Sequence, residues 1–243
     1  PALPITFRHV GTLDLSNVGL TTASDAFLRA FPRLESLMLN GNDLGALPDA
    51  VTGLERLTRL SAHHNELSDA PLLQRQLRAL PQLQQVDLET NHLDSFDVAG
   101  LDRLQVLNLN YNRLSDWPAG VLEAPALTTL GLRSNYNIET IPVGAFLPEH
   151  NALMAGTDLS DNMLEEREFL RLQEYQRETG RGLGFTPHDI DELLAGFHSE
   201  AEDDEPGLAL HPENETPEQA KARWFTGGAA DSERQAVWDT VMA

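Results

Sequence analysis

Histidine and carboxylate side chains that could bind a metal ion gather in one part of the sequence. His63 and His64 are adjacent, and Asp87, Glu89 and His92 follow. Imidazole and carboxylate groups are common ligands of zinc and related ions. No spacing rule brings these five groups to one point, and no nucleophile stands in a recognisable catalytic motif. We therefore predict no metal site, no cofactor and no catalytic residue in this chain.

The composition excludes several further kinds of site. The 243 residues include no cysteine, so no disulfide, zinc-thiolate site, iron–sulfur cluster or cysteine nucleophile forms within the chain. The formal net charge of −21 at pH 7 argues against nucleic acid or anionic lipid as the main partner, because both attract clustered Lys and Arg. No apolar run reaches about 18 residues, so we predict no membrane span. The chain begins at Pro1, and we expect it to be part of a longer protein.

Leucine is periodic along most of the chain. Of the 41 leucines, 34 lie in residues 1–164. The pattern LxxLxLxxNxL recurs there, and its first copy has Val18 in the Asn position. Later copies keep the Asn at intervals of 23, 26, 21, 23 and 27 residues, and these residues are Asn42, Asn65, Asn91, Asn112, Asn135 and Asn162. The pattern and the intervals are typical of leucine-rich repeats.

The repeat predicts an α/β fold in which residues 1–164 form a solenoid of about seven repeats. Each LxL segment is a short strand whose Leu side chains point inward, and successive strands pair in parallel to form a concave sheet. The Asn amides are predicted to satisfy backbone groups where the chain leaves each strand. Residues 47–56 would lie on the convex side as a loop or short helical turn.

The outward positions of the strands form rows across the predicted concave face. These rows are polar and include exposed apolar and aromatic residues, and solenoids bind partners on such surfaces. The residues that we predict to bind a protein are Met38, Arg59, His63, Asp87, Glu89, Asn108, Asn110, Tyr111 and Arg133. The alternative is a solvated sheet face whose polar residues only keep the protein soluble.

A helical region is predicted after the last repeat, with capping and docking helices over residues 165–198. The first helix, from Glu165 to Gly180, would cap the solenoid. The second begins at Thr186 and Pro187. Its apolar stripe is predicted to consist of Ile190, Leu193, Leu194 and Phe197. Residues 199–216 contain many carboxylates and no Lys or Arg, which predicts an acidic linker.

The last residues carry a resemblance to a known family. The segment ARWFTGGAADSERQAVWDTV, with Trp224, Phe225 and Trp238, follows the repeats and the capping helix. This order resembles bacterial NEL-type (novel E3 ligase) ubiquitin ligase effectors, in which a repeat solenoid precedes an all-helical ligase domain. The resemblance implies that residues 217–243 are the truncated start of such a domain.

The resemblance also implies a role. In the family, a cysteine in a Cys-x-Asp motif accepts ubiquitin from an E2 as a thioester and passes it to a substrate lysine. This chain has no cysteine, so that motif would lie outside it and no catalytic residue can be assigned. The implied partners are a host protein on the concave face and a ubiquitin-loaded E2 on the missing ligase domain. The implied location is the host cytoplasm, after secretion from a bacterium.

Two other interpretations use the same repeats. The chain could be a stand-alone interaction module without enzymatic activity. It could also be an extracellular receptor ectodomain, but such solenoids usually seal their ends with disulfide-bonded caps, which a chain without cysteine cannot form.

Overall fold

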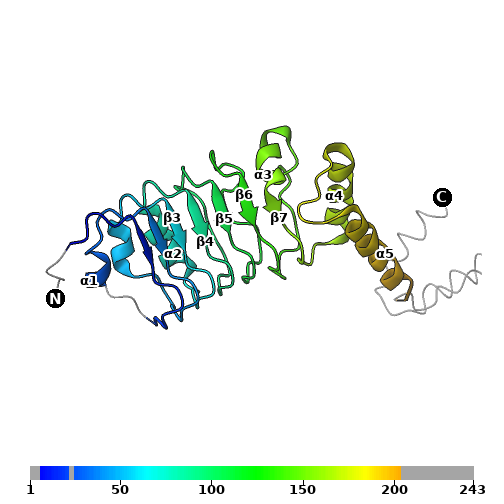
Figure 1. Cartoon of the computed structure of the whole chain (residues 1–243). Coiled ribbons are helices and arrows are strands. Elements are labelled where there is room, and N and C mark those ends of the chain that lie inside the picture. Colours follow the sequence, from blue (N-terminus) through cyan, green and yellow to red (C-terminus); the bar gives the residue numbers. More distant parts are fainter. Residues whose placement is uncertain (1–5, 22–24, 204–243) are drawn as a thin grey trace, which may run out of the picture. The chain divides into compact units, whose positions relative to one another are not determined.

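The computed structural model describes residues 6–21 and 25–203. The chain divides into two compact units, residues 1–195 and 196–243, and the repeats lie in the first. One parallel sheet contains seven strands in chain order (Figure 1). They are β1 Thr12–Asp14, β2 Ser36–Met38, β3 Arg59–Ser61, β4 Gln85–Asp87, β5 Val106–Asn108, β6 Thr129–Gly131 and β7 Thr157–Asp158. The predicted α/β repeat fold with a short-stranded parallel sheet is therefore confirmed.

Short helices and turns connect the strands on the other side of the repeats. They are α1 Asp25–Leu28, the 3-10 helix η1 Asp49–Gly53, α2 Ala70–Arg78, the 3-10 helix η2 Pro148–His150 and α3 Asn151–Ala155. The predicted short helical turn in residues 47–56 is present as η1. The α2 helix was not predicted from the repeat pattern. Asp69 caps it by accepting a hydrogen bond from the Leu72 N–H at 2.9 Å.

The register places equivalent residues of each repeat side by side. Leu37 pairs with Leu13 and Leu60, and the same alignment continues through the fourth and fifth strands. Leu37 and Leu39, the two leucines of one LxL segment, are both fully buried. The inward leucines therefore form a continuous core along the stack, because each repeat covers the apolar face of the next.

Asparagine side chains join each repeat to the one before it. Asn91 donates from Nδ2 to the carbonyl of Leu88 in its own repeat and of Ala62 in the preceding one, both at 3.0 Å. Its Oδ1 accepts from the Leu67 N–H, also at 3.0 Å. Asn65, Asn112 and Asn135 repeat this pattern, and Asn42 does so with a further N–H from Val18. The predicted structural role of these amides is confirmed.

These asparagine hydrogen bonds form a ladder along the stack, and the ladder is incomplete at Asn162. Its Nδ2 donates to the carbonyls of Leu132 and Leu159, but its buried Oδ1 accepts no hydrogen bond from any of the described residues. The cause is the extra residue in the sixth repeat, which moves Ile138 one position along the chain. The Ile138 N–H then donates to the Asn135 carbonyl at 2.9 Å and not to the next repeat.

Two helices follow the last strand, as predicted, α4 over Glu166–Thr179 and α5 over Pro187–Asp203. Gly180 ends α4 in the left-handed conformation, with φ 73°. The α4 helix buries Phe169, Leu172 and Tyr175. In the loop after it, the Leu183 carbonyl accepts a hydrogen bond from the Leu159 N–H at 2.7 Å. This loop covers the hydrogen-bonding edge that β7 would otherwise expose.

The second helix differs in part from its prediction. Thr186 and Asp189 form a reciprocal capping box, which holds the pKa of Asp189 below its ordinary value through hydrogen bonds from Thr186. Ile190 and Leu194 are buried, but Leu193 is exposed, so the predicted apolar stripe is narrower. The helix runs to Asp203, past residue 199 where we predicted the linker to begin. The remainder of the predicted linker and all of 217–243 lie outside the described residues.

The ladder generates a matched stability prediction. Substituting Asn91→Ala leaves the buried Leu67 N–H and two carbonyls without side-chain partners, so we expect the free energy of unfolding to fall by about 2–4 kcal/mol. Asn162→Ala should cost less, because Asn162 receives no hydrogen bond at Oδ1. Urea denaturation followed by circular dichroism measures both. Equal losses would show that the Oδ1 bond contributes nothing.

Candidate protein-binding face

The outward side chains of the strands form a surface that we call the sheet face. Its first row is Thr12, Ser36, Arg59, Gln85, Val106 and Thr129, and its second is Asp14, Met38, Ser61, Asp87, Asn108, Gly131 and Asp158. Its third row is Ser16, Asn40, His63, Glu89, Asn110, Arg133 and Ser160, whose backbone pairing continues beyond the strands. The register confirms that the residues of the first two rows align across the sheet as expected from the repeat.

A hollow of about 390 Å³ lies on the sheet face over β2 to β5. Four of the nine predicted binding residues line it, namely Met38, Arg59, Asp87 and Asn108. Ser61, Gln85 and Val106 also line it, and they are not among the predicted binding residues. The other five predicted residues, His63, Glu89, Asn110, Tyr111 and Arg133, follow the strands and do not line the hollow.

Many polar residues of the sheet face hold the strand ends in place. At four strands, the second-row side chain accepts a hydrogen bond from the backbone N–H two residues later, as Asp87 does from Glu89 at 3.2 Å. The same bond joins Asp14 to Ser16, Asn108 to Asn110 and Asp158 to Ser160. Hydrogen bonds from Ser16 also keep the pKa of Asp14 below its ordinary value. These Asx turns satisfy an N–H that the sheet leaves unpaired.

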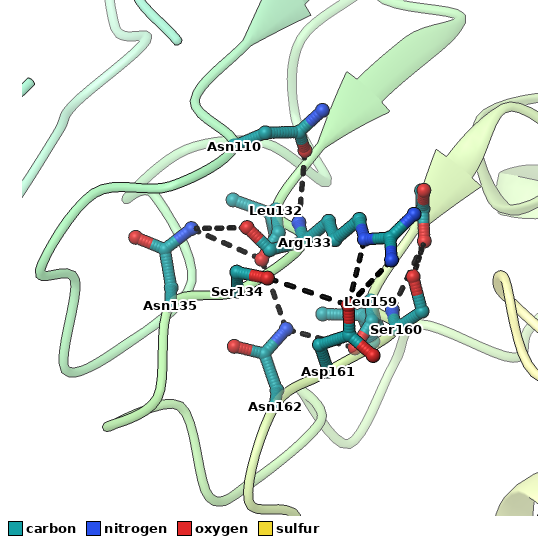
Figure 2. A network of polar contacts seen from close by, with 10 residues as sticks. Asn110, Leu132, Arg133, Ser134, Asn135, Leu159, Ser160, Asp161 and Asn162 are labelled. Atoms are coloured by element: carbon teal, nitrogen blue, oxygen red, sulfur yellow. Dashed lines mark hydrogen bonds and ion pairs between the residues drawn. The ribbon is translucent and has the colours of Figure 1, made fainter. Parts of the chain in front are cut away.

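At β3 and β6, where the second-row residue does not make this bond, the preceding repeat supplies the acceptor. Gly131 has no side chain, and Asn110 Oδ1 accepts from the Arg133 N–H at 2.8 Å in its place (Figure 2). Asn40 Oδ1 likewise accepts from the His63 N–H at 3.2 Å and from the Ser61 hydroxyl at 2.7 Å. Asn110, which we predicted to bind a partner, therefore has a structural role at the strand end.

The residue after the third row adopts a left-handed backbone conformation in every repeat. Its φ lies between 54° and 61° at Asn17, Gly41, His64, Thr90, Tyr111, Ser134 and Asp161. The repeat pattern alone predicts Tyr111 on the concave face, among the outward residues of the strands. Instead the chain turns there, which leaves the Tyr111 side chain 43% exposed and buries Ser134. Only the prevalence of Asn, Asp and Gly at this position hinted at the turn.

Ion pairing distinguishes the two arginines of the sheet face. Arg133 contacts Asp161 Oδ2 through Nε at 2.7 Å and through Nη2 at 2.6 Å (Figure 2). The hydrogen bond to Asp161 raises the pKa of Arg133 above its ordinary value. The exposed Arg59 side chain has no ion-pair or hydrogen-bond partner among the described residues.

The three histidines near the sheet face make two separate contacts, and they do not converge on one point. His63 and His64 face one another, with their Nδ1 atoms 2.9 Å apart, while His92 Nε2 contacts Glu66 Oε2 at 2.6 Å. In residues 6–21 and 25–203, no three His, Asp or Glu side chains are grouped in a way that could hold a metal ion. Over the same residues, no helix is long and apolar enough to cross a membrane.

Comparison with known proteins agrees with this geometry. Residues 8–67 match the family model described as leucine rich repeat. A leucine-rich-repeat protein of Leptospira interrogans is similar at 25% identity and TM-score 0.55, with 65% of this chain and 39% of that chain covered. The functional domain of InlJ from Listeria monocytogenes is similar at 23% identity and TM-score 0.51, with 63% of this chain and 31% of that chain covered. The internalin InlF of Listeria monocytogenes is similar at 21% identity and TM-score 0.51, with 68% of this chain and 44% of that chain covered.

These similarities define the class of protein. The chain has the leucine-rich-repeat fold, and its residues 8–67 match the repeat family by sequence. It spans less than half the length of each of the three similar structures. Stacked repeats of this kind present an extended surface for other proteins, so the chain is a protein-interaction module.

Stability measurements should separate structural from free residues of the sheet face. We expect Asn110→Ala to lower the free energy of unfolding by about 1 kcal/mol, because the Arg133 N–H loses its acceptor. Asn110→Asp keeps the acceptor and should retain stability. Arg59→Ala should change stability by no more than about 0.5 kcal/mol, since the exposed side chain has no partner in the described part of the chain. A loss at Arg59 as large as that at Asn110 would contradict the assignment.

Proposed function

We propose that this chain is the substrate-recognition region of a secreted bacterial E3 ubiquitin ligase effector, and that a host protein binds the sheet face at the hollow. The observation that carries the recognition role is the hollow itself, which combines apolar groups with the Arg59 guanidinium, a charged group that has no partner among the described residues. It lies over four adjacent strands, β2 to β5, so it is broad enough to accept side chains of another protein.

Residues that line the hollow differ in how free they are to bind a partner. Asp87 accepts hydrogen bonds from Ser61 and from the Glu89 N–H, and Asn108 accepts from the Asn110 N–H. Met38 and Val106 contribute partly exposed apolar surface, and Arg59 contributes a guanidinium that pairs with none of the described side chains. Apolar contact next to a free guanidinium is typical of the residues that dominate protein interfaces.

The ligase part of the proposal is supported by the order of the sequence. The repeats are followed by α4 and α5 and then by the segment with Trp224, Phe225 and Trp238 that resembles the start of a NEL-type ligase domain. Because the 243 residues contain no cysteine, they cannot form the ubiquitin thioester. The role of this chain would be to bind the substrate. A cysteine-containing domain would accept ubiquitin from an E2 and transfer it to that substrate.

A stand-alone interaction module is the second candidate, and the same hollow would serve it. The two functions differ in one measurable property, which is the transfer of ubiquitin by the whole gene product. Secretion from a bacterium and action in the host cytoplasm belong to the first function only.

A competition experiment tests both parts of the proposal. The whole gene product, with E1, E2, ubiquitin and host lysate, should form ubiquitin conjugates and a reductant-sensitive thioester. The 243-residue chain alone should form neither, because it has no cysteine. Added in excess, it should suppress conjugation of the substrate by occupying it, as measured by immunoblotting for ubiquitin.

Matched variants locate the binding surface in the same assay. Met38→Glu places a charge in the hollow and should abolish the suppression, whereas Glu55→Lys, on an exposed loop outside the sheet face, should not. A gene product that forms no thioester would reject the ligase role and leave the stand-alone module. Full suppression by the Met38 variant would reject the hollow as the binding surface.

A further inference from the structure

The first row of the sheet face carries a single charged residue. Arg59 stands between Ser36 and Gln85, which are its partners in the register on either side. The other residues of the row, Thr12, Val106 and Thr129, are also uncharged. The sheet therefore presents an isolated positive charge along this row, without a neighbouring carboxylate of the same row to neutralise it.

Arg59 differs in this respect from Arg133, the other arginine of the sheet face. Asp161 accepts two contacts from the Arg133 guanidinium, so its charge and part of its donor set are already used. The described residues offer no such partner to the exposed Arg59 side chain. A guanidinium has five N–H donors in a fixed plane, and it pairs with a carboxylate through two parallel hydrogen bonds.

The surroundings of Arg59 are suited to a peptide. The hollow of about 390 Å³ places Arg59 among Met38 and Val106, which are apolar, and Ser61 and Gln85, which are neutral and polar. The volume accommodates a few side chains of another protein. A carboxylate at Arg59 would thus be flanked by apolar contacts, which exclude water and strengthen the charged hydrogen bonds.

We propose that the partner presents an aspartate or glutamate carboxylate to Arg59, from an extended segment whose neighbouring apolar side chains pack on Met38 and Val106. This inference rests on the proposed protein-binding function and specifies the chemistry of the bound segment.

The net charge of −21 does not oppose such a contact at short range. Interactions between exposed charges are screened beyond about 8 Å at physiological salt, whereas a bidentate pair forms at hydrogen-bond distance. The nearest carboxylate in the hollow, Asp87, already accepts from Ser61 and from the Glu89 N–H. A partner carboxylate displaced toward Asp87 or Glu89 would be repelled, so the lone guanidinium also selects the position of the segment.

Selection from a displayed library of random 12-residue peptides tests the inference. Peptides that the 243-residue chain retains, and that Met38→Glu does not, should be enriched in Asp or Glu beside apolar residues. For a synthetic peptide from this set, Arg59→Gln should weaken binding about 10- to 100-fold by fluorescence anisotropy. Replacing the peptide carboxylate by its amide should weaken binding equally, and combining both changes should add little, because each removes the same contact.

Two control variants test whether binding depends on the paired donors of the guanidinium and on the position of the arginine at residue 59. Arg59→Lys keeps the charge but loses the paired donors and should bind with intermediate affinity. Arg56→Gln removes an arginine from an exposed loop outside the sheet face and should bind as the unchanged chain does. Unchanged thermal unfolding of Arg59→Gln shows that the fold is retained.

Each other result overturns the inference. Hollow-binding peptides without an acidic residue, or with equal affinity for Arg59→Gln, would refute it while leaving the protein-binding function in place. The recovery of no hollow-binding peptide would also count against it. Failure of the proposed function is seen separately, as unchanged suppression of conjugation by the Met38→Glu variant.

Discussion

The need to satisfy buried backbone groups between repeats controls this structure. Each strand is only two or three residues long, so the sheet alone pairs few of the polar groups in a repeat. The Asn amide supplies the missing donors and acceptor, as Asn91 does for Ala62, Leu88 and Leu67. Because these bonds reach into the preceding repeat, they fix the stacking of the repeats and therefore the alignment of every row on the sheet face.

The same requirement decides which polar residues remain free for a partner. Strand ends need an acceptor for one more N–H, and Asp87, Asn108 and Asn110 provide it from positions that point outward. A polar sheet face is therefore not in itself a sign of binding. The residues that distinguish this face are those whose side chains make no hydrogen bond or ion pair with the described residues. They are above all Arg59 and the apolar Met38 and Val106, which line one hollow.

The fold was predictable from the sequence because its determinants recur. The Leu and Asn positions repeat at regular intervals, so the strands, their parallel order, their register and the role of the amides followed from one pattern. The site was predictable only in part, since the hollow depends on side-chain sizes on four neighbouring strands. The use of Asn110 to replace an absent side chain at Gly131 depends on contact between repeats, which no single repeat reveals. The α2 helix lies in a connection that the repeat pattern does not specify.

The inserted residue before Ile138 has a consequence for how the stack comes apart. Asn162 makes one bond to the preceding repeat where the other ladder residues make at least two, so the asparagine contribution to the joint between the sixth and seventh repeats is the smallest of the series. Repeat proteins behave as one-dimensional arrays, in which unfolding starts where coupling is least. The seventh repeat would then exchange its amide hydrogens together with α4 and the loop at Leu183, as one cooperative block. Motion in that block would leave the hollow over β2 to β5 intact.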